Sequence, residues 1–355
     1  MTPHITIGKR KVGKGYPVYI IAEMSANHKN DFEIAKNIVY AAKEAGADAI
    51  KLQTFTADIH TLNSTKKFFQ VCGGTIWDGE TLYNLYKKCE MPWEWQPKLK
   101  DLADDIGIDL FSAAVDPTSV AFLEEIGVPV HKVSSFEMVD TNLIRVMAET
   151  GKPIIISTGM ASLCEIVDAV EVARSAGCDQ VALMKCTSAY PAPFEDLNLV
   201  TIPHMAECFS VPVGISDHTM GIMVPVAAVA MGAALIEKHF TLSRENVGPD
   251  STFSIEPAEL AELVKAVRDT ERSLGRVQYE VTEREKASRM FRRSLFAVKK
   301  IEEGEKFTPE NTRSIRPGHG LKPKYLDFVL GKEAACTIEP GTPLQWNLIR
   351  PAKEK

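Results

Sequence analysis

Short apolar segments rich in β-forming residues recur along the chain, and each is followed by a loop and a helical pattern. Eight of them are predicted to be strands: residues 18–23, 48–53, 108–113, 130–135, 153–158, 181–186, 211–216 and 234–239. Between them apolar residues recur at helical spacing, as at Ile34, Ile38, Ala41 and Ala45. Strands that alternate with helices indicate parallel βαβ units. Eight units within about 240 residues predict an α/β fold of the (β/α)8 TIM-barrel type, which typically takes ~250 residues.

The pattern changes near residue 285. A charged stretch, "VTEREKASRMFRRS", is followed over residues 294–350 by short alternating segments separated by turns. This texture is typical of a small, mostly β domain with a little helix. We therefore expect a barrel domain over residues 1–285, and a linker with a small C-terminal domain over residues 286–355.

The last predicted strand shows where polar residues gather. Fifteen uncharged residues lead into "EKHFTL", in which Glu237, Lys238 and His239 stand side by side. A buried parallel strand is continuously apolar, whereas its C-terminal end opens on the face where such barrels carry their active sites. Seven of the eight predicted strands end in ionisable or hydroxyl side chains. They include Glu23, Lys51, Gln53, Lys132, Ser135, Glu137, Ser157, Thr158, Lys185, Thr187, Ser188, Tyr190, Ser216, Asp217, His218, Glu237, Lys238 and His239. We interpret them as a functional rim rather than as ordinary polar strand ends.

Two histidines follow neighbouring strands of the predicted barrel. His218 and His239 should therefore lie close together, and imidazole pairs suit divalent transition metals. Glu23 is a candidate oxygen ligand, directly or through water, and water or substrate would complete the coordination. The rival interpretation is a pair of buried, hydrogen-bonded imidazoles.

Three lysines are predicted to point into the same barrel mouth. A charged amine there is costly unless it meets an anion. Lys51, Lys132 and Lys185, with the hydroxyls of nearby serines, therefore favour a phosphate or carboxylate site. The alternative is a Schiff-base lysine of an aldolase, whose amine pKa is lowered by burial.

More than fifty residues separate the second and third predicted strands. This insertion holds three of the four tryptophans, Trp77, Trp93 and Trp95. A long loop on the catalytic face is suited to substrate specificity, and aromatic faces suit sugar rings. The aromatic residues of 68–95 would equally suit a satellite core.

Composition narrows the class of protein. The chain is 45% hydrophobic and 25% charged, with a net charge of −6, which argues against nucleic acid as the main partner. The N-terminus has no apolar signal segment, and the apolar run at 222–236 is too short to span a membrane. Seven cysteines without a C-x-x-C pair favour free thiols, so we expect a cytoplasmic protein. The sequence has no G-x-G-x-x-G, P-loop or H-E-x-x-H motif, which leaves nucleotide binding unsupported.

Eight motifs occur in order along nearly the whole chain: "IIAEMSANHKND", "IKLQTF", "HKVSSFE", "GKPIIISTGMAS", "KCTSAYPAPFEDLNL", "GISDHTMG", "IEKHFTLSRENVGPDSTFSIEP" and "IRPGHG". Together they resemble the sialic acid synthase family. The C-terminal part is similar to the antifreeze-like (SAF) domain of these enzymes. The segments "GGTIWDGETLYNLYKKCEMPWEW" and "SIRPGHGLKPKYLD" are most similar to the pseudaminic acid synthase branch.

The resemblance implies a transferase reaction that joins phosphoenolpyruvate to an open-chain amino sugar. Carbon 3 of phosphoenolpyruvate attacks the sugar aldehyde, water adds at carbon 2, and phosphate leaves by C–O cleavage. In the pseudaminic branch the sugar is 2,4-diacetamido-2,4,6-trideoxy-L-altrose. A divalent metal, most often Mn²⁺ with Mg²⁺ or Co²⁺ as alternatives, polarises the aldehyde. N-acetylneuraminate or legionaminate synthases use the same chemistry on other sugars.

The resemblance also implies roles for individual residues. His218 and His239 match the metal ligands, and Glu23 and Glu137 match acidic residues near the reacting carbons. Phosphate and carboxylate contacts are implied for Lys51, Lys132, Ser135, Ser157, Ser188 and Ser216. Sugar contacts are implied for Gln53, Tyr190 and Asp250. Arg316 matches an arginine that reaches the sugar from the partner subunit, which implies a domain-swapped homodimer.

Two rim positions depart from the N-acetylneuraminate relatives, which commonly have Thr at the position of Ala113 and Asn at that of Ser188. Ala113 donates no hydrogen bond, so the anion site must be completed differently here. Both changes suit a more apolar, 6-deoxy sugar.

A non-enzymatic sugar- or ice-binding protein, suggested by the C-terminal domain alone, would leave the charged rim unexplained.

Overall fold

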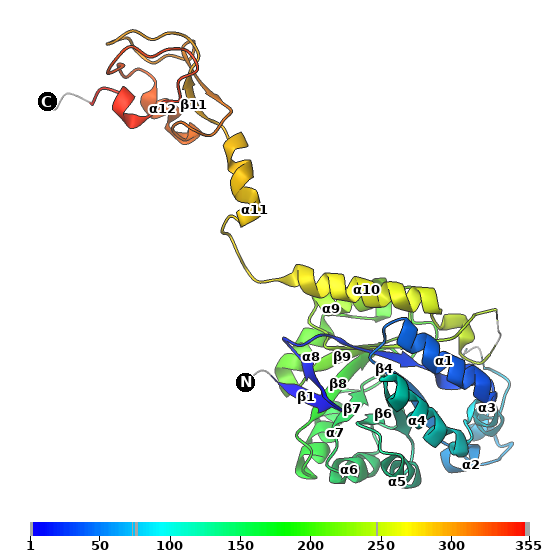
Figure 1. Ribbon diagram of the computed structural model, residues 1–355. Helices are drawn as coiled ribbons and strands as arrows, with labels where there is room; N and C mark the ends of the chain where they lie inside the picture. The colour runs from blue at the N-terminus through cyan, green and yellow to red at the C-terminus, as the bar shows by residue number, and fades with distance from the viewer. Residues whose placement is uncertain (1–2, 73, 75–76, 246–247, 352–355) are drawn as a thin grey trace. The chain divides into compact units, whose positions relative to one another are not determined.

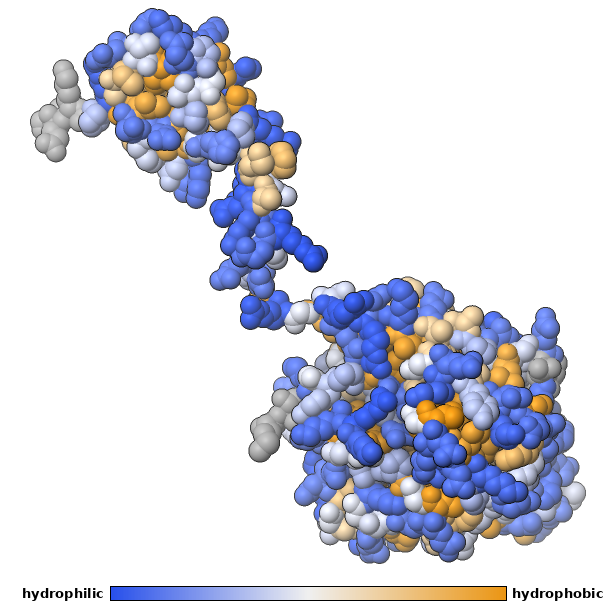
Figure 2. Space-filling view, viewed as in Figure 1, coloured by the Kyte–Doolittle hydropathy of each residue, from blue (hydrophilic) through white to orange (hydrophobic). Residues whose placement is uncertain are grey.

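The computed structural model describes residues 3–72, 74, 77–245 and 248–351, and the chain divides into two compact units, Met1–Gly275 and Arg276–Lys355. The predicted boundary near residue 285 falls inside the second unit, in the short helix α11 (Glu283–Lys286). Figure 2 shows hydrophilic residues over most of the visible surface of each unit, with apolar residues in smaller groups. In the described part of the chain, no helix combines the length and the apolar character that a membrane span needs.

The first unit contains the predicted parallel barrel, closed by pairing of the last strand with the first (Figure 1). Its strands are β3 (Tyr19–Glu23), β4 (Ala49–Thr54), β5 (Asp109–Ala114), β6 (His131–Val133), β7 (Ile154–Ser157), β8 (Val181–Cys186), β9 (Val213–Asp217) and β10 (Leu235–His239). Each lies within one of the eight predicted segments or extends at most one residue beyond it. The strands are almost fully buried, as expected for a parallel sheet covered by helices.

Helices surround the barrel, and several of them begin at capping side chains. They are α1 (Phe32–Glu44), α4 (Gln96–Ile106), α5 (Pro117–Glu125), α6 (Thr141–Glu149), α7 (Leu163–Ser175), α8 (Thr201–Phe209), α9 (Met223–Ala230) and α10 (Pro257–Leu274). The predicted capping box of α7 is present, since the Ser162 side chain accepts from Glu165 N and Glu165 bonds back to Ser162. Asp31 caps α1 in the same role. The insertion between β4 and β5 adds α2 (Ala57–His60) and α3 (Leu82–Cys89).

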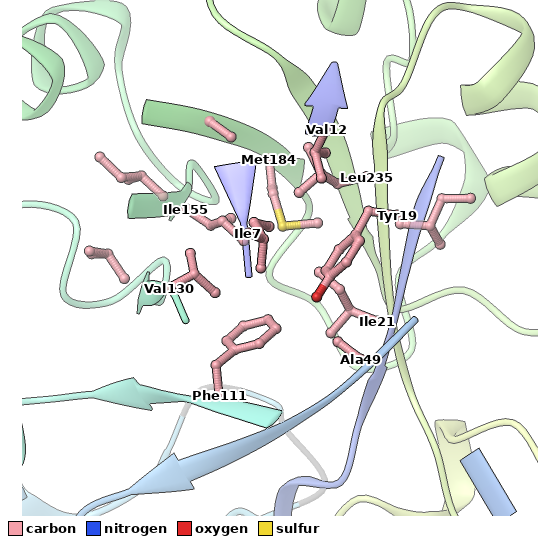
Figure 3. Close-up of a cluster of buried hydrophobic side chains, with 14 of the residues drawn as sticks. Ile7, Val12, Tyr19, Ile21, Ala49, Phe111, Val130, Ile155, Met184 and Leu235 are labelled. Carbon is pink, nitrogen blue, oxygen red and sulfur yellow. The ribbon is translucent and has the colours of Figure 1, made fainter. Parts of the chain in front are cut away.

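A hairpin that the sequence analysis did not predict closes the other end of the barrel. It pairs β1 (His4–Ile7) with β2 (Arg10–Gly13). Ile5, Ile7 and Val12 are at most 1% exposed. Figure 3 shows Ile7 and Val12 beside residues from the strands and their N-terminal approaches: Tyr19, Phe111, Val130, Ile155, Met184 and Leu235. The hairpin therefore supplies the floor of the barrel core.

The second unit has a small core of its own. It contains β11 (Ser294–Ala297) paired antiparallel with β12 (Thr312–Ile315), several isolated β-bridges and the short helix α12 (Leu326–Val329). Leu295, Phe307 and Leu344 are among its buried residues. This agrees with the predicted small, mostly β domain.

Strand register sets the first geometry of the site. Glu23 at the end of β3 pairs with Lys51 of β4 on one side and with His239 of β10 on the other. Ala113 of β5 pairs with Lys132 of β6. The polar strand ends therefore meet at one end of the barrel, as predicted.

Candidate active site

A cavity of about 420 Å³ opens at the C-terminal ends of the strands. Small-molecule sites commonly measure ~300–1,000 Å³. The strand side chains that line it are Lys51, Gln53, Ala113, Lys132, Ser157, Cys186, Ser216, Glu237 and His239. Loop side chains at its wall include Ser25, Ser135, Glu137, Tyr190, His218 and Asp250. Most of the predicted site residues therefore share one cavity.

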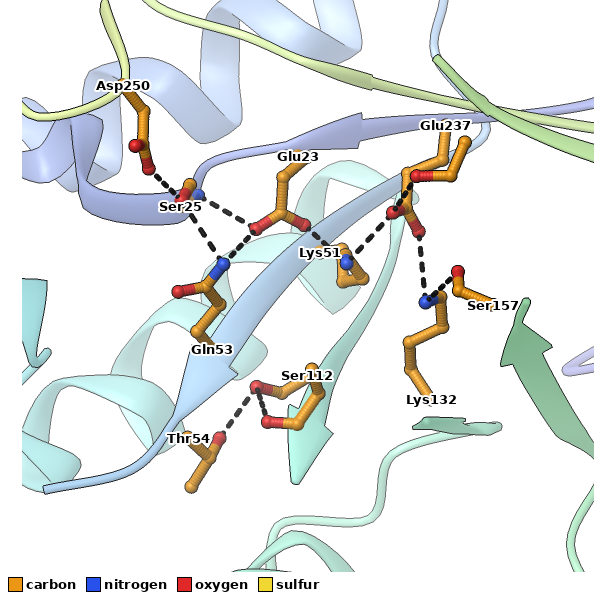
Figure 4. A network of polar contacts seen from close by, with 12 residues as sticks. Glu23, Ser25, Lys51, Gln53, Thr54, Ser112, Lys132, Ser157, Glu237 and Asp250 are labelled. Carbon is orange, nitrogen blue, oxygen red and sulfur yellow. Dashed lines mark hydrogen bonds and ion pairs between the residues drawn. The ribbon is translucent and has the colours of Figure 1, made fainter. Parts of the chain in front are cut away.

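Two lysines and two glutamates form a buried charge cluster in this cavity (Figure 4). Lys51 Nζ lies 2.9 Å from Glu23 Oε2 and 3.0 Å from Glu237 Oε1. Lys132 Nζ donates to Ser157 Oγ at 2.7 Å, and Glu237 Oε2 is 4.0 Å away. Ser216 Oγ donates to Glu237 Oε1 at 3.1 Å. Lys51 is thus matched by two carboxylates, whereas Lys132 has only one at the edge of ion-pair distance.

Burial and charge separate the pKa values of these groups. Burial raises the pKa of Glu23 to about 7, although Lys51 opposes the shift. Burial also disfavours the Glu237 carboxylate, but Lys132 and Lys51 outweigh it and lower its pKa to about 2. Burial lowers the pKa of Lys132 to about 8, partly offset by Glu237. Glu237 is thus the permanent anion of the cluster, and Glu23 and Lys132 titrate nearer neutrality.

Lys185 does not point into the cavity, contrary to the prediction. Its Nζ donates to the carbonyl of Cys186 at 2.9 Å and to Thr187 Oγ1 at 3.1 Å. Successive strand residues face opposite sides, so Cys186 occupies the cavity wall and Lys185 faces outward. Burial disfavours the Cys186 thiolate, but a hydrogen bond with His218 lowers the thiol pKa to about 7. Cys186 was not predicted, and strand alternation is the signal that could have identified it.

A second polar group joins Glu23 to Ser25, Gln53 and Asp250 (Figure 4). Glu23 Oε1 accepts from Ser25 N at 3.1 Å and from Gln53 Nε2 at 3.2 Å. Ser25 Oγ donates to Asp250. Burial raises the pKa of Asp250. Gln53 and Asp250 therefore meet through Ser25, a residue that the sequence analysis did not select.

His218 and His239 lie together, with their ring centroids 5.3 Å apart. His218 Nδ1 is 2.9 Å from the carbonyl of Thr187, to which it can donate, and the ring also hydrogen-bonds with the Cys186 thiol. His239 Nδ1 is buried without a hydrogen-bond partner. Burial lowers the pKa of His239 well below its usual value, and the charge of His218 adds to the effect. His239 is therefore neutral near pH 7, the form that binds metals.

The two imidazoles fit a shared metal ion. A metal lies ~2.1 Å from an imidazole nitrogen, so two imidazoles on one ion have ring centres about 5 Å apart. The carbonyl bond of His218 is the kind that orients a metal-binding imidazole. Glu23 Oε1 accepts two hydrogen bonds, whereas Oε2 contacts Lys51 as an ion pair and has no hydrogen-bond partner, so the role of Glu23 as an oxygen ligand stays a prediction. In the described ranges no three His, Cys, Asp or Glu side chains are grouped so that they could hold a metal.

Gly159 allows two predicted serines to approach each other. Its backbone N donates to Ser135 Oγ at 3.1 Å. A Cβ at this position would clash with both Ser135 Oγ and Ser188 Oγ. Ser188 Oγ also lies 3.7 Å from Cys186 Sγ. The two hydroxyls therefore converge beside the cavity wall, close to the serine-bearing strand β7.

The aromatic residues of the insertion divide between the two interpretations. Trp77 lies 5.7 Å from the ring of Tyr190, which itself packs 4.3 Å from His218, so Trp77 belongs to the cavity wall. Trp93 instead packs on Phe122 of α5 at 4.7 Å. The α3 side of the cavity is mostly apolar, formed with Phe55, Val71, Leu82, Leu85 and Tyr86. Trp95 packs on Phe32 and His28.

Two further predicted residues lie apart from the charge cluster. Glu137 lines the cavity, where burial raises its pKa. Arg316 follows β12 in the second unit, and its role toward the barrel stays a prediction. The loop after it is well anchored, since Ser294 Oγ donates to the Pro317 carbonyl at 2.6 Å and accepts from Gly320 N at 2.8 Å.

Comparison with known proteins agrees with this architecture. Residues 38–279 match the NeuB family, and residues 292–350 match the SAF domain. The chain is 43% identical to a pseudaminic acid synthase of Campylobacter jejuni, covering 92% of this chain and 95% of that protein. It is 36% identical to an N,N'-diacetyllegionaminic acid synthase of Legionella pneumophila, covering 96% and 97%. The crystal structure of an N-acetylneuraminic acid synthetase from Leptospira borgpetersenii, in complex with citrate, superposes with a TM-score of 0.73 at 33% identity, covering 81% of this chain and 95% of that one.

Proposed function

The chain belongs to the NeuB family and ends in a SAF domain, and we propose that it is a pseudaminic acid synthase. It condenses phosphoenolpyruvate with 2,4-diacetamido-2,4,6-trideoxy-L-altrose and water, and releases pseudaminic acid and phosphate. The observation that carries the proposal is one cavity that joins a lysine–serine anion site to two imidazoles and an apolar aromatic wall. The 43% identity to a pseudaminic acid synthase over 92% of the chain supports the choice of sugar.

Phosphoenolpyruvate binds at the lysine–serine side. Its phosphate and carboxylate meet Lys51, Lys132 and the hydroxyls of Ser135, Ser157, Ser188 and Ser216. The incomplete pairing of Lys132 supports this assignment, because its ammonium has Ser157 at 2.7 Å but a carboxylate only at 4.0 Å. An arriving anion would supply the missing charge in a site of low dielectric.

His218 and His239 hold a divalent metal, with Mn²⁺ the expected ion and Mg²⁺ or Co²⁺ as alternatives. When bound, the metal supplies Lewis-acid polarisation of the sugar aldehyde. The separation of the two rings, 5.3 Å, and the free Nδ1 of His239 support this role.

Glu23 moves protons in the reaction. It lies between Lys51 and the Ser25–Gln53 pair, and burial raises its pKa to about 7, so both protonation states are accessible near neutral pH. Water that adds to carbon 2 must lose a proton, and Glu23 can accept it. Glu137, which also lines the cavity, is the second candidate acid or base.

The sugar occupies the side of the cavity formed by Gln53, Tyr190 and Asp250. Arg316 of a partner subunit reaches the same sugar in a domain-swapped homodimer. Mixed dimers test this directly. Subunits carrying Arg316→Ala and His239→Ala are each inactive alone, and together they should restore one working site. Verified mixed dimers that stay inactive would exclude a shared site.

The first test of the function is phosphate release from phosphoenolpyruvate in the presence of Mn²⁺. The altrose sugar, its legionaminic-route counterpart and N-acetylmannosamine are offered in parallel. Release with the altrose sugar alone is expected, and release with another sugar would assign the chain to that branch. Borohydride trapping distinguishes the lysine-aldolase alternative, because an imine at Lys132 would give a covalent adduct.

A further inference from the structure

Lys238 stands between Glu237 and His239 in the sequence, but its side chain faces away from the cavity. Its Nζ lies 2.6 Å from Asp217 Oδ2 and donates to the carbonyl of Thr219 at 2.6 Å. The side chains of Lys238 and Asp217 are 1% and 0% exposed. Asp217 also accepts from Thr219 N at 3.0 Å and from Thr219 Oγ1 at 3.1 Å.

The residues that make these contacts are direct chain neighbours of the two histidines. Asp217 and Thr219 are the residues on either side of His218, and Lys238 immediately precedes His239. One ammonium therefore ties both neighbours of His218 to the strand that carries His239. The strands reinforce the tie, because Asp217 and Lys238 are partners in the β9–β10 register.

A purely structural role does not explain why this position carries a charge. Ile236, two residues earlier on the same face of β10, is fully buried and apolar. Burying an ion pair is often no more stabilising than apolar packing of the same volume. Unlike apolar packing, the ammonium group makes directional bonds. It holds the turn after β9 at two points, the Asp217 carboxylate and the Thr219 carbonyl.

We propose that Lys238 and Asp217 are positioning residues that fix the separation of His218 and His239 and thereby set the affinity for the divalent metal. This inference rests on the proposed metal site. Groups that orient metal ligands typically change metal affinity by ~10–100-fold when removed. Neither Asp217 nor Lys238 is among the residues that line the cavity, so the main effect of the pair should be on the metal.

The experiment compares Asp217→Asn, Lys238→Gln and the double variant in the full-length chain. The double variant leaves a neutral pair that can still hydrogen-bond, and it guards against the misfolding that one unpaired buried charge would cause. Mn²⁺ affinity is measured by electron paramagnetic resonance, phosphoenolpyruvate affinity by calorimetry without metal, and folding by circular dichroism. Asp48→Asn is the matched control, because Asp48 is buried and pairs with Arg10 and Arg268 elsewhere in the barrel domain.

We expect about a tenfold or larger loss of Mn²⁺ affinity in the folded variants, with phosphoenolpyruvate affinity within twofold of wild type. Asp48→Asn should lower stability without changing Mn²⁺ affinity. Unchanged Mn²⁺ affinity in the folded double variant would overturn the inference, and so would an equal loss of both affinities. Equal Mn²⁺ binding by wild type and His239→Ala would instead overturn the proposed metal site, and the inference with it.

Discussion

Lys132 Nζ donates to Ser157 Oγ at 2.7 Å, and this hydroxyl is its closest polar side-chain partner among the described contacts. The nearest carboxylate oxygen is 4.0 Å away. A buried ammonium with so little countercharge is prepared for an anion rather than satisfied by the protein. This contrast with Lys51, which two carboxylates contact, gives the first prediction.

Lys132→Met should raise the KM for phosphoenolpyruvate by roughly 10- to 100-fold, since a hydrogen bond to a charged group contributes ~1.5–3 kcal/mol. Lys185→Met is the matched control, because Lys185 is on another strand of the same barrel, β8, but faces away from the cavity. Its KM should stay within twofold of wild type. Steady-state phosphate release measures both, and equal effects would show that the charge of Lys132 is not special.

Phosphoenolpyruvate affinity should fall as pH rises from about 6 to 9. Glu23, whose pKa is raised to about 7, becomes an anion over this range, and Lys132, whose pKa is lowered to about 8, loses its charge. The first change adds a negative charge and the second removes a positive one, so both weaken the binding of an anion. Calorimetry across pH tests this, and Glu23→Gln should remove the step near pH 7 while the step near pH 8 remains.

The raised pKa of Glu23 also predicts how the stability of the protein depends on pH. Burial raises the pKa of Glu23 from 4.5 to about 7, so its contribution to stability is present below pH 4.5 and is lost as pH rises through 7. Glu23→Gln cannot ionise and should show a smaller decrease in the free energy of unfolding over this interval. Chemical denaturation at pH 5 and pH 8, compared between the two proteins, gives the answer. A wild-type protein that gains more stability than the variant across this interval would contradict the pKa shift.

His239→Ala should abolish turnover and weaken Mn²⁺ binding while the protein stays folded. Its Nδ1 has no hydrogen-bond partner in the structure, so little polar bonding is lost with the ring. Circular dichroism, Mn²⁺ titration and phosphate release are measured on the same preparation. An active variant that binds Mn²⁺ normally would remove His239 from the metal site.

Gly159→Ala should impair phosphoenolpyruvate binding without unfolding the barrel. The added methyl group would occupy the space where Ser135 Oγ and Ser188 Oγ converge, so at least one hydroxyl must turn away. Loss of one such contact to an anion should raise the KM for phosphoenolpyruvate on the order of tenfold. An unchanged KM would show that these two serines lie outside the anion site.

Trp77→Ala should raise the KM for the sugar by roughly tenfold, consistent with the ~0.5–1.5 kcal/mol of an aromatic contact and the loss of buried area. The KM for phosphoenolpyruvate should not change. Trp93→Phe is the control, because Trp93 packs on Phe122 of α5. Equal sugar KM values in wild type and Trp77→Ala would exclude the insertion residue from the sugar site.

The barrel strands could be predicted because buried parallel strands are continuously apolar, and their order along the chain is their order in the sheet. The hairpin at residues 4–13 could not, since it has few residues and its outer positions are charged. Its buried residues Ile5, Ile7 and Val12 cover the open N-terminal end of the barrel, and this role can be recognised only when the barrel is already known.

Within the site, the sequence predicted which strand ends carry polar residues, but it did not predict which way each side chain points. Residues at strand ends were selected together, although neighbours such as Lys185 and Cys186 face opposite sides of the sheet. Ser25 shows a second limit. Its importance comes from the two groups it connects, Asp250 and Gln53, which are far apart in sequence.

The barrel floor has a consequence for anyone who shortens this chain. The NeuB match begins at residue 38, which invites a truncated version starting there. Such a protein would lose the β1–β2 hairpin, exposing Phe111 and Leu235, and also β3, which completes the ring beside β10 and carries Glu23. A barrel without β3 would have two unpaired strand edges and exposed apolar residues at its N-terminal end. We expect such a protein to aggregate, so it could not be used to measure catalysis. The first residues are thus as necessary to a usable minimal enzyme as the cavity itself.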